Sequence, residues 1–448
     1  MIQEKNFFQR LTSNIDWWLV FAFAVLMLIS FITIYSACFN YGTPLKYLSV
    51  QFLAFGLGVV GLLFLTSLNY QYFKQLDKVV YVLSLVLLVS VLIFGSVKRG
   101  TRGWFDFGYI SLQPVEIAKI MFILVLASFL DRKAKEAKRV SFLISVFAIL
   151  ISHLFLIMMQ PDFSSTLSYF PVTLVLLFMI GVQPFYLLCI MVLGSLAICI
   201  PLLETFLNMQ LQLLQKEIFL TNFAIALKSS WFGVYIALTV LFLIIGSWWF
   251  LWKLRVKISI VYPVVLCVSI LLGCVASIPV EKSLKDYQRK RLVVFLNPKV
   301  DPRGSGYNII QSKIAIGSGK FTGKGFKKGT QTQLGFLPEQ HTDFIFSVIG
   351  EEGGWIIAQL TLFFYFLFIW RALTIAKEAR DRYGSLVAVG LATMFAFYVV
   401  INIGMVMGMM PVTGIPLLLL SYGGSSMLSS LCAIGILCSI SLRRYTYY

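Results

Sequence analysis

Long runs of apolar residues alternate with short polar connections along the whole chain. A helix needs roughly 20 mostly apolar residues to cross a bilayer. Runs that approach this length cover residues 17–37, 47–67, 79–96, 115–130, 141–159, 166–183, 185–203, 231–252, 258–280, 343–370, 384–408 and 415–442. The pattern predicts an all-α polytopic membrane protein, one membrane domain over residues 1–448, with about twelve transmembrane helices.

Two segments depart from this alternation. Within residues 204–257, an amphipathic stretch precedes the eighth run, with Leu207, Leu211, Leu214 and Ile218 on one helical face and Asn208, Gln212 and Gln215 on another. Such a stretch predicts a helix that lies in the outer membrane interface. The second segment is residues 281–341, a polar loop much longer than the other connections.

Composition supports the membrane assignment. Aliphatic, aromatic and cysteine residues make up 59% of the chain and charged residues 12%, whereas soluble domains carry about 25% charged residues. The net charge of +18 could suit nucleic acid, but most cations lie in short connections between apolar runs. We therefore expect membrane lipids, and no nucleic acid, as partners.

Lysine and arginine are divided unevenly between the two sides of the membrane. With the N-terminus inside, the inner segments carry eighteen of these residues and the short outer connections carry six. Positive residues favour the cytoplasmic side, so both termini are predicted to be cytoplasmic. The loop 281–341 then lies outside with twelve cations. An anionic outer ligand or anionic lipid headgroups would each explain them.

Residues able to carry chemistry gather at the predicted outer ends of the spans. Arg102 and Trp104 lie in the connection after the third run, and Gln113, Glu116 and Lys119 follow. Glu116 and Lys119 are three residues apart, so they can pair on one helical turn. A lysine one turn inside the bilayer is costly and often functional. The alternative is an interfacial aromatic residue beside a structural ion pair.

Other outer segments also have two interpretations. Asp162 could serve chemistry, although a helix cap before Ser164 and Ser165 is favoured. Residues 411–416 and 421–426 place Pro and Gly within the C-terminal apolar runs. The backbone groups freed there must be satisfied within protein or a wet cavity. Small residues at these positions can instead allow close helix packing.

The long loop contains three candidate sites. Asp301 precedes Pro302 and is predicted to lie on a turn among cations, where a capping role is the plain alternative. Residues 317–325 are rich in Gly and Lys but lack the spacing of a P-loop. They predict a flexible cationic loop whose amides, with Lys320, Lys324, Lys327 and Lys328, could meet a pyrophosphate. In residues 339–343, Glu339, His341 and Asp343 could bind a divalent ion, or Thr342 or Asp343 could cap the next helix.

Together these motifs resemble the SEDS family of bacterial cell-wall polymerases, which includes RodA and FtsW. The matching stretches are 102–104, 113–116, 160–162, 297–306, 311–319, 336–346 and 421–425. Residues 323–325 with 329–331 are similar to the RodA branch rather than the FtsW branch. The family has ten spans, so the two extra ones would belong to an insertion at 204–257. Val115 also departs from the Ser or Ala common in the family's Gln-Pro-x-Glu motif.

The resemblance implies a glycosyltransferase that polymerises lipid II at the outer face of the bacterial cytoplasmic membrane during elongation. It implies Asp301 as the catalytic carboxylate, acting as general base or as ligand of a divalent ion such as Mg²⁺ or Mn²⁺. The implied substrate-binding residues are Arg102, Trp104, Gln113, Glu116, Lys119, Asn308, Gln311, Lys313, Lys324, Thr330, Gln331, Glu339, His341, Thr342, Asp343, Ser421, Tyr422, Gly423 and Gly424.

The implied partners are lipid II, a class B penicillin-binding protein and other membrane proteins of the elongation complex. Three alternatives remain open from the sequence: a lipid II flippase or transporter, a septal polymerase like FtsW, and a non-catalytic scaffold for the penicillin-binding protein. Because the polar motifs concentrate at the outer ends of the spans, chemistry at that face is favoured over passage through the protein.

Overall fold

The computed structural model describes residues 14–98, 101–106, 108, 111–137, 139–214, 261–283 and 305–444, with isolated positions between 239 and 294. The chain divides into two compact units. The main unit comprises residues 1–180 and 308–448, and the middle unit comprises residues 181–307.

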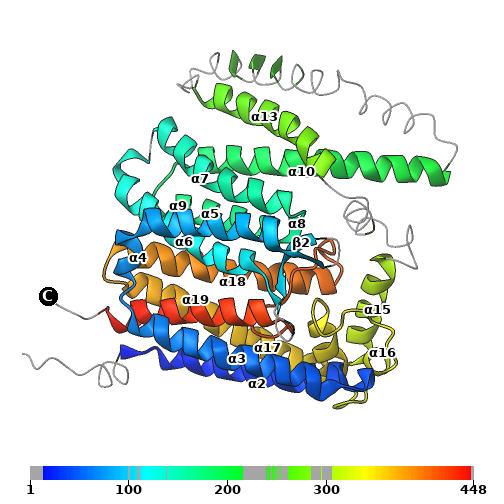
Figure 1. The fold of residues 1–448 in the computed structure, drawn as a ribbon. Coiled ribbons are helices and arrows are strands. Elements are labelled where there is room, and N and C mark those ends of the chain that lie inside the picture. The colour runs from blue at the N-terminus through cyan, green and yellow to red at the C-terminus, as the bar shows by residue number, and fades with distance from the viewer. Residues whose placement is uncertain are drawn as a thin grey trace, which may run out of the picture. The chain divides into compact units, whose positions relative to one another are not determined.

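The main unit is a bundle of long helices (Figure 1). Its helices up to residue 180 are α2 (Trp17–Ala37), η1 (Phe39–Tyr41), α3 (Pro44–Ser67), α4 (Gln71–Gln75), α5 (Asp77–Phe94), α6 (Pro114–Lys133), η2 (Ala134–Glu136), α7 (Val140–Met159), α8 (Phe163–Leu167) and α9 (Tyr169–Met179). Its later helices are α15 (Ser305–Ser318, which begins in the middle unit), α16 (Thr330–Gln333), α17 (Ile345–Glu378), α18 (Arg382–Val406) and α19 (Gly424–Leu442).

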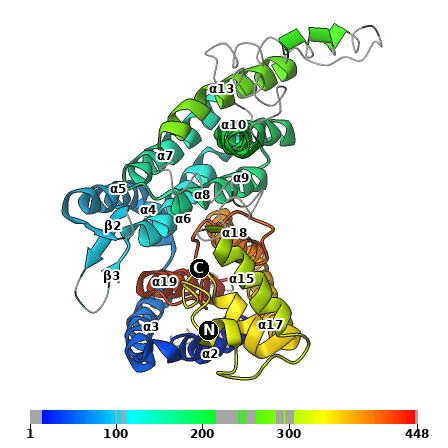
Figure 2. The same ribbon diagram turned by 90° about the vertical axis from the view of Figure 1, so that its right-hand side faces the viewer.

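Helix α19 lies inside this bundle, and nearly all of its residues are buried. It packs mainly against α3, with further contacts to α6, α17 and α18 (Figure 2). Glycines bring α3 and α19 close together, because a Cβ on Gly58 would lie 2.3 Å from Leu431 and one on Gly435 would lie 2.7 Å from the Leu62 carbonyl oxygen. Small residues at such contacts are typical of helix pairs packed within membranes.

Eight helices of the described residues are long and apolar enough to cross a membrane. They are Trp17–Ala37, Pro44–Ser67, Asp77–Phe94, Ser141–Met159, Pro184–Pro201, Ile345–Glu378, Arg382–Val406 and Gly424–Leu442. The prediction of a polytopic helical membrane protein is confirmed. Two shorter apolar helices, Phe163–Met179 and Tyr262–Ile278, match the sixth and ninth runs, and α6 matches the fourth. The eighth run is described only at isolated positions, so the count of about twelve stays a prediction.

One predicted boundary was wrong. The last run was expected to span residues 415–442, but helix α19 begins only at Gly424, and residues 411–417 have no regular structure. Pro411, Gly414 and Pro416 lie in this segment, and proline cannot donate the backbone hydrogen bond that a helix needs. The interfacial helix was expected within residues 204–257. Its first part continues α10 (Pro184–Leu214) and its remainder lies outside the described residues, so its place in the interface stays a prediction.

Helix α17 is longer than a membrane is thick. Its 34 residues would extend about 51 Å, against roughly 30 Å of hydrocarbon. The helix is broken at Gly354, whose φ of 65° and ψ of −166° are not helical. Two exposed tryptophans, Trp355 and Trp370, lie fifteen residues apart in the part after the break. Tryptophans favour the two membrane interfaces, so this part fits a single crossing.

A small antiparallel sheet joins α5 to α6, although only helices were expected. It has the order β1 (Ser96–Lys98), β2 (Thr101–Asp106) and β3 (Ser111–Leu112). Val97 pairs with Arg102, and Phe105 pairs with Leu112. The sheet therefore fixes how the connection that carries Arg102 and Trp104 leaves the bundle.

In the middle unit, α10 packs along α13 (Val261–Ser283). A Cβ on Gly273 of α13 would lie 3.0 Å from the Leu193 carbonyl oxygen, so the glycine lets the two helices approach closely. The rings of Phe185 and Tyr262 meet edge to face with centroids 4.9 Å apart. The two helices thus form a tightly packed pair.

Candidate active site

The β2 strand presents Arg102 and Trp104 on the same face, because side chains alternate along a strand. Arg102 is exposed, and its guanidinium donates to the Leu92 carbonyl at 3.4 Å. Gly103 points the other way, where a Cβ would lie 3.6 Å from Oε1 of Gln160. The strand thus turns Gly103 toward Gln160 and places the two predicted site residues on its other face, with Arg102 exposed and Trp104 half-buried.

The N-terminal ends of three helices meet beside this sheet. Gln113, which precedes α6, donates from Nε2 to Oδ2 of Asp162 at 2.8 Å. Its backbone N–H donates to Oγ of Ser425 in the first turn of α19 at 2.7 Å. Asp162 caps α8 by accepting from the N–H of Ser165 at 3.1 Å and from its hydroxyl at 2.7 Å. The cap predicted for Asp162 is confirmed, and its second oxygen also ties α8 to α6.

The predicted pair of Glu116 and Lys119 is present and buried. Nζ of Lys119 lies 3.1 Å from Oε1 of Glu116, and the two side chains are 2% and 8% exposed. Lys119 also donates to the hydroxyl of Tyr398 on α18. Helix α6 begins at Pro114, as expected, so both charges lie in its first two turns. Each charge therefore has a partner in a region where an isolated one would be very costly.

Residues 411–423 cross the interior of the bundle largely without regular structure, and side chains satisfy their backbone. Ser30 donates to the Leu420 carbonyl at 2.9 Å, and Tyr365 donates to the Leu418 carbonyl at 2.5 Å. Asn402 donates to the Ile415 carbonyl at 2.7 Å. Unpaired backbone groups at membrane depth cost several kcal/mol each, so these contacts are what make the segment possible.

The end of this segment holds Ser421, Tyr422, Gly423 and Gly424, all predicted site residues. Gln51 of α3 accepts from the N–H of Gly423 at 3.2 Å and donates to the Ser421 carbonyl at 3.4 Å. The hydroxyl of Ser421 accepts from the Leu417 N–H at 2.8 Å. Gly424 is the first residue of α19. These contacts hold the turn before α19 in one conformation.

His341 joins that turn to the segment before α17. Its carbonyl accepts from the N–H of Tyr422 at 2.9 Å. The rings of His341, Tyr422 and Tyr47 lie mutually within 5.6 Å between centroids. Gln340, the preceding residue, donates to the Ala37 carbonyl at the end of α2 at 2.7 Å. The structure therefore brings the predicted segments 339–343 and 421–424 together.

The expected cap of α17 was wrong. The residue before the first helical turn is Phe344, with no side-chain capping bond, and not Thr342 or Asp343. Thr342 instead donates from its hydroxyl to the carboxylate of Glu339 at 3.2 Å, and Glu339 has a φ of 52°. Among the described residues, no group of three or more His, Cys, Asp and Glu side chains could hold a metal ion. The divalent ion stays a prediction.

The glycine-rich loop was expected to be flexible, and this was wrong. Residues 319–325 fill the break in α17: the N–H groups of Lys324 and Gly325 donate to the Glu351 and Glu352 carbonyls, both at 3.0 Å. In return, the Trp355 N–H donates to the Lys320 carbonyl at 3.0 Å. The broken helix thus pairs with backbone donors and acceptors of the loop that a free loop would offer to a ligand.

Glycine is required for this docking. A Cβ on Gly323, whose φ is 79°, would lie 2.1 Å from the Glu352 carbonyl oxygen, and one on Gly319 would lie 1.9 Å from the Gly350 carbonyl oxygen. The glycines that suggested a phosphate-binding loop are explained instead by close contact between two backbones.

The side chain of Lys324 points to a buried carboxylate. Its Nζ lies 2.8 Å from Oε1 of Glu351, and it donates to the hydroxyl of Thr330 at 2.6 Å. The backbone N–H of Gln331 donates to Glu351 at 2.9 Å. Lys324, Thr330 and Gln331 are therefore brought together as predicted site residues. Lys327 lies over the Phe39 ring at 4.1 Å, whereas Lys320 and Lys328 are exposed.

Helix α15 carries Asn308, Gln311 and Lys313. Asn308 and Gln311 are half-buried and three residues apart, so they share a face. Lys313 is exposed and passes over Gly408, where a Cβ would lie 2.3 Å from Cε of the lysine. Ser312 fixes the helix by donating to the Val406 carbonyl at 2.6 Å. Asp301, the predicted catalytic carboxylate, lies outside the described residues.

Sequence reasoning missed four buried residues that organise these sites: Gln51, Glu351, Tyr398 and Asn402. Each lies within an apolar run, and a polar residue inside a span is itself a signal, because it must find a partner. The sequence could have identified them as important. It could not have named their partners, which lie on other helices.

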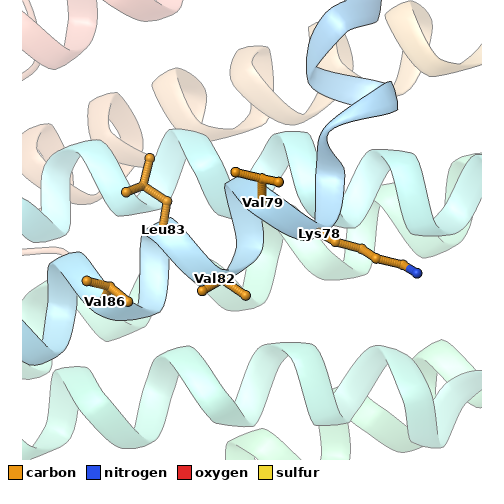
Figure 3. A pocket seen from close by; sticks show the side chains of 5 residues that line it. All are labelled: Lys78, Val79, Val82, Leu83 and Val86. Atoms are coloured by element: carbon orange, nitrogen blue, oxygen red, sulfur yellow. The ribbon is translucent and has the colours of Figure 1, made fainter.

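A hollow of about 400 Å³ lies along α5, away from these groups (Figure 3). It is lined by Lys78, Val79, Val82, Leu83 and Val86. These residues follow the spacing of one helical face and are almost entirely apolar. Apart from Lys78, its lining is aliphatic and suits contact with hydrocarbon.

Comparisons with known proteins agree with this arrangement. The sequence model for FtsW, RodA and SpoVE, described as a cell cycle protein, matches residues 12–235 and 227–446. The chain is 36% identical over 444 residues to the peptidoglycan glycosyltransferase RodA of Treponema pallidum, covering 97% of this chain and 99% of that one. It is 34% identical to the peptidoglycan glycosyltransferase MrdB of Escherichia coli K12, covering 81% and 77%.

Solved structures are similar as well. A chain in a structure titled "Structural coordination of polymerization and crosslinking by a peptidoglycan synthase complex" has a TM-score of 0.65 at 27% identity, covering 97% of this chain and 99% of that one. The crystal structure of the rod shape determining protein RodA of Thermus thermophilus has a TM-score of 0.58 at 23% identity, covering 97% and 98%. The latter likeness concerns the fold.

Proposed function

Because this chain belongs to the FtsW, RodA and SpoVE family, we propose that it is a peptidoglycan glycosyltransferase. In this proposal it polymerises lipid II at the outer face of the bacterial cytoplasmic membrane, with both termini cytoplasmic, and releases undecaprenyl pyrophosphate. One observation carries the proposal: motifs distant in sequence meet at one end of a membrane-spanning bundle. Gln113 contacts Asp162 and Ser425, and His341 contacts Tyr422.

The proposed reaction needs two things from the protein. A sugar hydroxyl attacks an anomeric carbon, and a general base accepts its proton. The pyrophosphate leaves as an anion, so it needs positive charge more than a proton donor. One carboxylate with several cations then suffices, unlike the paired carboxylates of glycosidases. Lys324 and Arg102 are the cations that we propose for the leaving group. Lys119 would shape the floor of the site together with Glu116.

We assign the base to Asp301, as the family resemblance implies. Asp301 would take the proton of the attacking hydroxyl directly, or it would hold a divalent ion, Mg²⁺ or Mn²⁺, that activates this hydroxyl. Trp104, half-buried on β2, would stack on a sugar or on the prenyl chain. The remaining half-buried groups on α15, Asn308 and Gln311, would bind the sugar-linked portion.

The elongation role rests on finer sequence features. Gly323-Lys324-Gly325 and Gly329-Thr330-Gln331 resemble the RodA branch. A septal role like that of FtsW is the alternative. A class B penicillin-binding protein is the proposed partner, because a chain of similar fold occurs in a peptidoglycan synthase complex.

Substitution of the proposed base is the direct test. Purified Asp301→Ala should form no glycan polymer from lipid II, whereas purified wild-type protein should form it. Asp286→Ala, a carboxylate of the same outer loop, is the matched control and should keep its activity. Treatment of the wild-type protein with EDTA distinguishes the two roles of Asp301. Polymerisation should stop if Asp301 holds a divalent ion and continue if Asp301 is the general base.

Full polymerisation by Asp301→Ala would exclude Asp301 as the base. Movement of lipid II across liposomes without any polymer from the wild-type protein would favour the transporter instead.

A further inference from the structure

The carboxylate of Glu351 lies at the centre of a hydrogen-bond network beside the break in α17. Its side chain is fully buried. Oε1 accepts from Lys324 at 2.8 Å, from the Thr330 hydroxyl at 3.1 Å and from the Gln331 N–H at 2.9 Å. Oε2 accepts from the Thr332 N–H at 3.0 Å. One carboxylate therefore joins the glycine-rich loop to the start of α16.

We propose that Glu351 is the positioning residue for Lys324 and the Thr330–Gln331 turn, and that these groups together stabilise the negative charge that develops on the phosphate-linked leaving group. The inference rests on the proposed function and adds a residue to it. Neither the sequence motifs nor the family resemblance described above included Glu351.

The geometry of Lys324 supports an anion partner. An ammonium group has three N–H donors, and two of them are used within the described residues, by Glu351 and Thr330. The lysine side chain is 24% exposed although its carboxylate partner is fully buried. The third donor can therefore reach a ligand from an ammonium group that is already oriented. Orientation before binding lowers the cost of charge stabilisation in the reaction.

The contact between Glu351 and Lys324 also indicates whether kcat or KM should change when Glu351 is replaced. Glu351 repels a phosphate bound at Lys324, so its negative charge does not improve ground-state binding. Its contribution is to hold Lys324 and the turn where negative charge develops. Loss of the carboxylate should lower kcat without raising KM, because an interaction made chiefly in the transition state is lost.

The neighbouring residue provides a matched control. Glu352 is a half-buried carboxylate on the same turn, but it accepts from Ser36 of α2 at 2.7 Å and from Gln333 at 3.0 Å. It does not contact Lys324 in the described structure. Glu352→Gln removes a carboxylate charge from the adjacent, less buried position and should leave the kinetics near wild type.

Kinetics on lipid II test the proposal with four variants: Glu351→Gln, Lys324→Met, the double variant and Glu352→Gln. We expect a loss of at least ten-fold in kcat for Glu351→Gln, with KM unchanged or lower. The double variant should be no slower than Lys324→Met, because both changes remove one unit of function. Wild-type kcat in Glu351→Gln, a rise in KM alone, or additive losses in the double variant would each overturn the proposal.

Limited trypsin digestion tests the positioning independently of activity. In wild-type protein, the docked loop should resist cleavage after Lys324, and Glu351→Gln should be cut there several-fold faster while its unfolding temperature stays within a few degrees. Equal cleavage rates would refute positioning by Glu351. If wild-type protein forms no polymer, the proposed function fails, and this digestion still decides whether Glu351 holds Lys324.

Discussion

Two pairs of lysine and glutamate occupy different regions of the main unit. Lys119 and Glu116 lie one turn apart on α6 and are both buried among helices. Lys324 and Glu351 are separated by 27 residues, and the lysine is partly exposed. The first pair is internal to one helix, whereas the second ties a loop into a broken helix. The nearly equal N–O distances, 3.1 and 2.8 Å, therefore arise from unlike local structures.

The comparison shows how burial changes what a charge pair contributes. Where both partners are desolvated, the pair mainly avoids the cost of an isolated charge, and removal of one partner is severe. Where the lysine reaches solvent, water can screen it and the pair adds less to stability. The buried pair is therefore suited to hold structure, and the half-exposed one is suited to meet a ligand.

The largest expected effect comes from breaking the buried pair. Lys119→Met leaves the Glu116 carboxylate buried without its ammonium partner and should lower the free energy of unfolding by about 3–5 kcal/mol. Denaturation of the purified protein in detergent measures it. Removing both charges, with Glu116→Gln added, should recover most of the loss. A single variant as stable as wild type would mean that Glu116 is satisfied by other groups.

An intermediate effect is expected at the docked loop. Gly323→Ala adds a Cβ that meets the Glu352 carbonyl at a positive φ, and such strain costs about 1–3 kcal/mol. Hydrogen exchange at the amides of Lys324, Gly325 and Trp355 should become faster. Gly317→Ala is the control, since a Cβ there meets nothing within 4 Å. Unchanged exchange in Gly323→Ala would show that the loop is docked less tightly than its hydrogen bonds indicate.

The smallest effect concerns the Thr330 hydroxyl, which contacts both members of the half-exposed pair. Thr330→Val removes a group that accepts from Lys324 and donates to Glu351. Because Thr330 is exposed, the free energy of unfolding should fall by about 1 kcal/mol or less. Thermal unfolding of Thr330→Val measures this loss. The control is Thr322→Val, which changes another exposed threonine of the same loop. A larger loss would mean that the turn at Thr330 stabilises the wider bundle.

The same two pairs show what could be predicted from the sequence. The pair on α6 could be predicted from its spacing of three residues. The spans could be predicted from the lengths of the apolar runs, and the start of α6 from Pro114. The pair of Lys324 and Glu351 depends on where a loop returns to a helix, which no local pattern encodes. Gly354 gave no sign of a break, because glycines are common in membrane helices.

The site residues also divide into those set by local sequence, which could be predicted, and those set by contacts between distant segments, which could not. Asp162 was correctly predicted as a cap, because capping needs only the next turn of the chain. The motif at 339–343 was misjudged as a cap for α17, because its conformation depends on contacts with α2 and on the turn before α19. Proline and glycine in residues 411–416 signalled freed backbone. The side chains that satisfy it come from helices throughout the chain, so their identity required the structure.

Those side chains also constrain the order in which the protein can be assembled. The carbonyls and amides of residues 411–423 depend on Ser30, Gln51, Tyr365 and Asn402, which belong to α2, α3, α17 and α18. A membrane protein is made from its N-terminus, so this segment leaves the ribosome after all four partners. Residues 411–423 can reach their final conformation only after α2, α3, α17 and α18 have packed together. A chain with one misplaced helix would retain unsatisfied backbone groups in the bilayer, at a cost of several kcal/mol for each group.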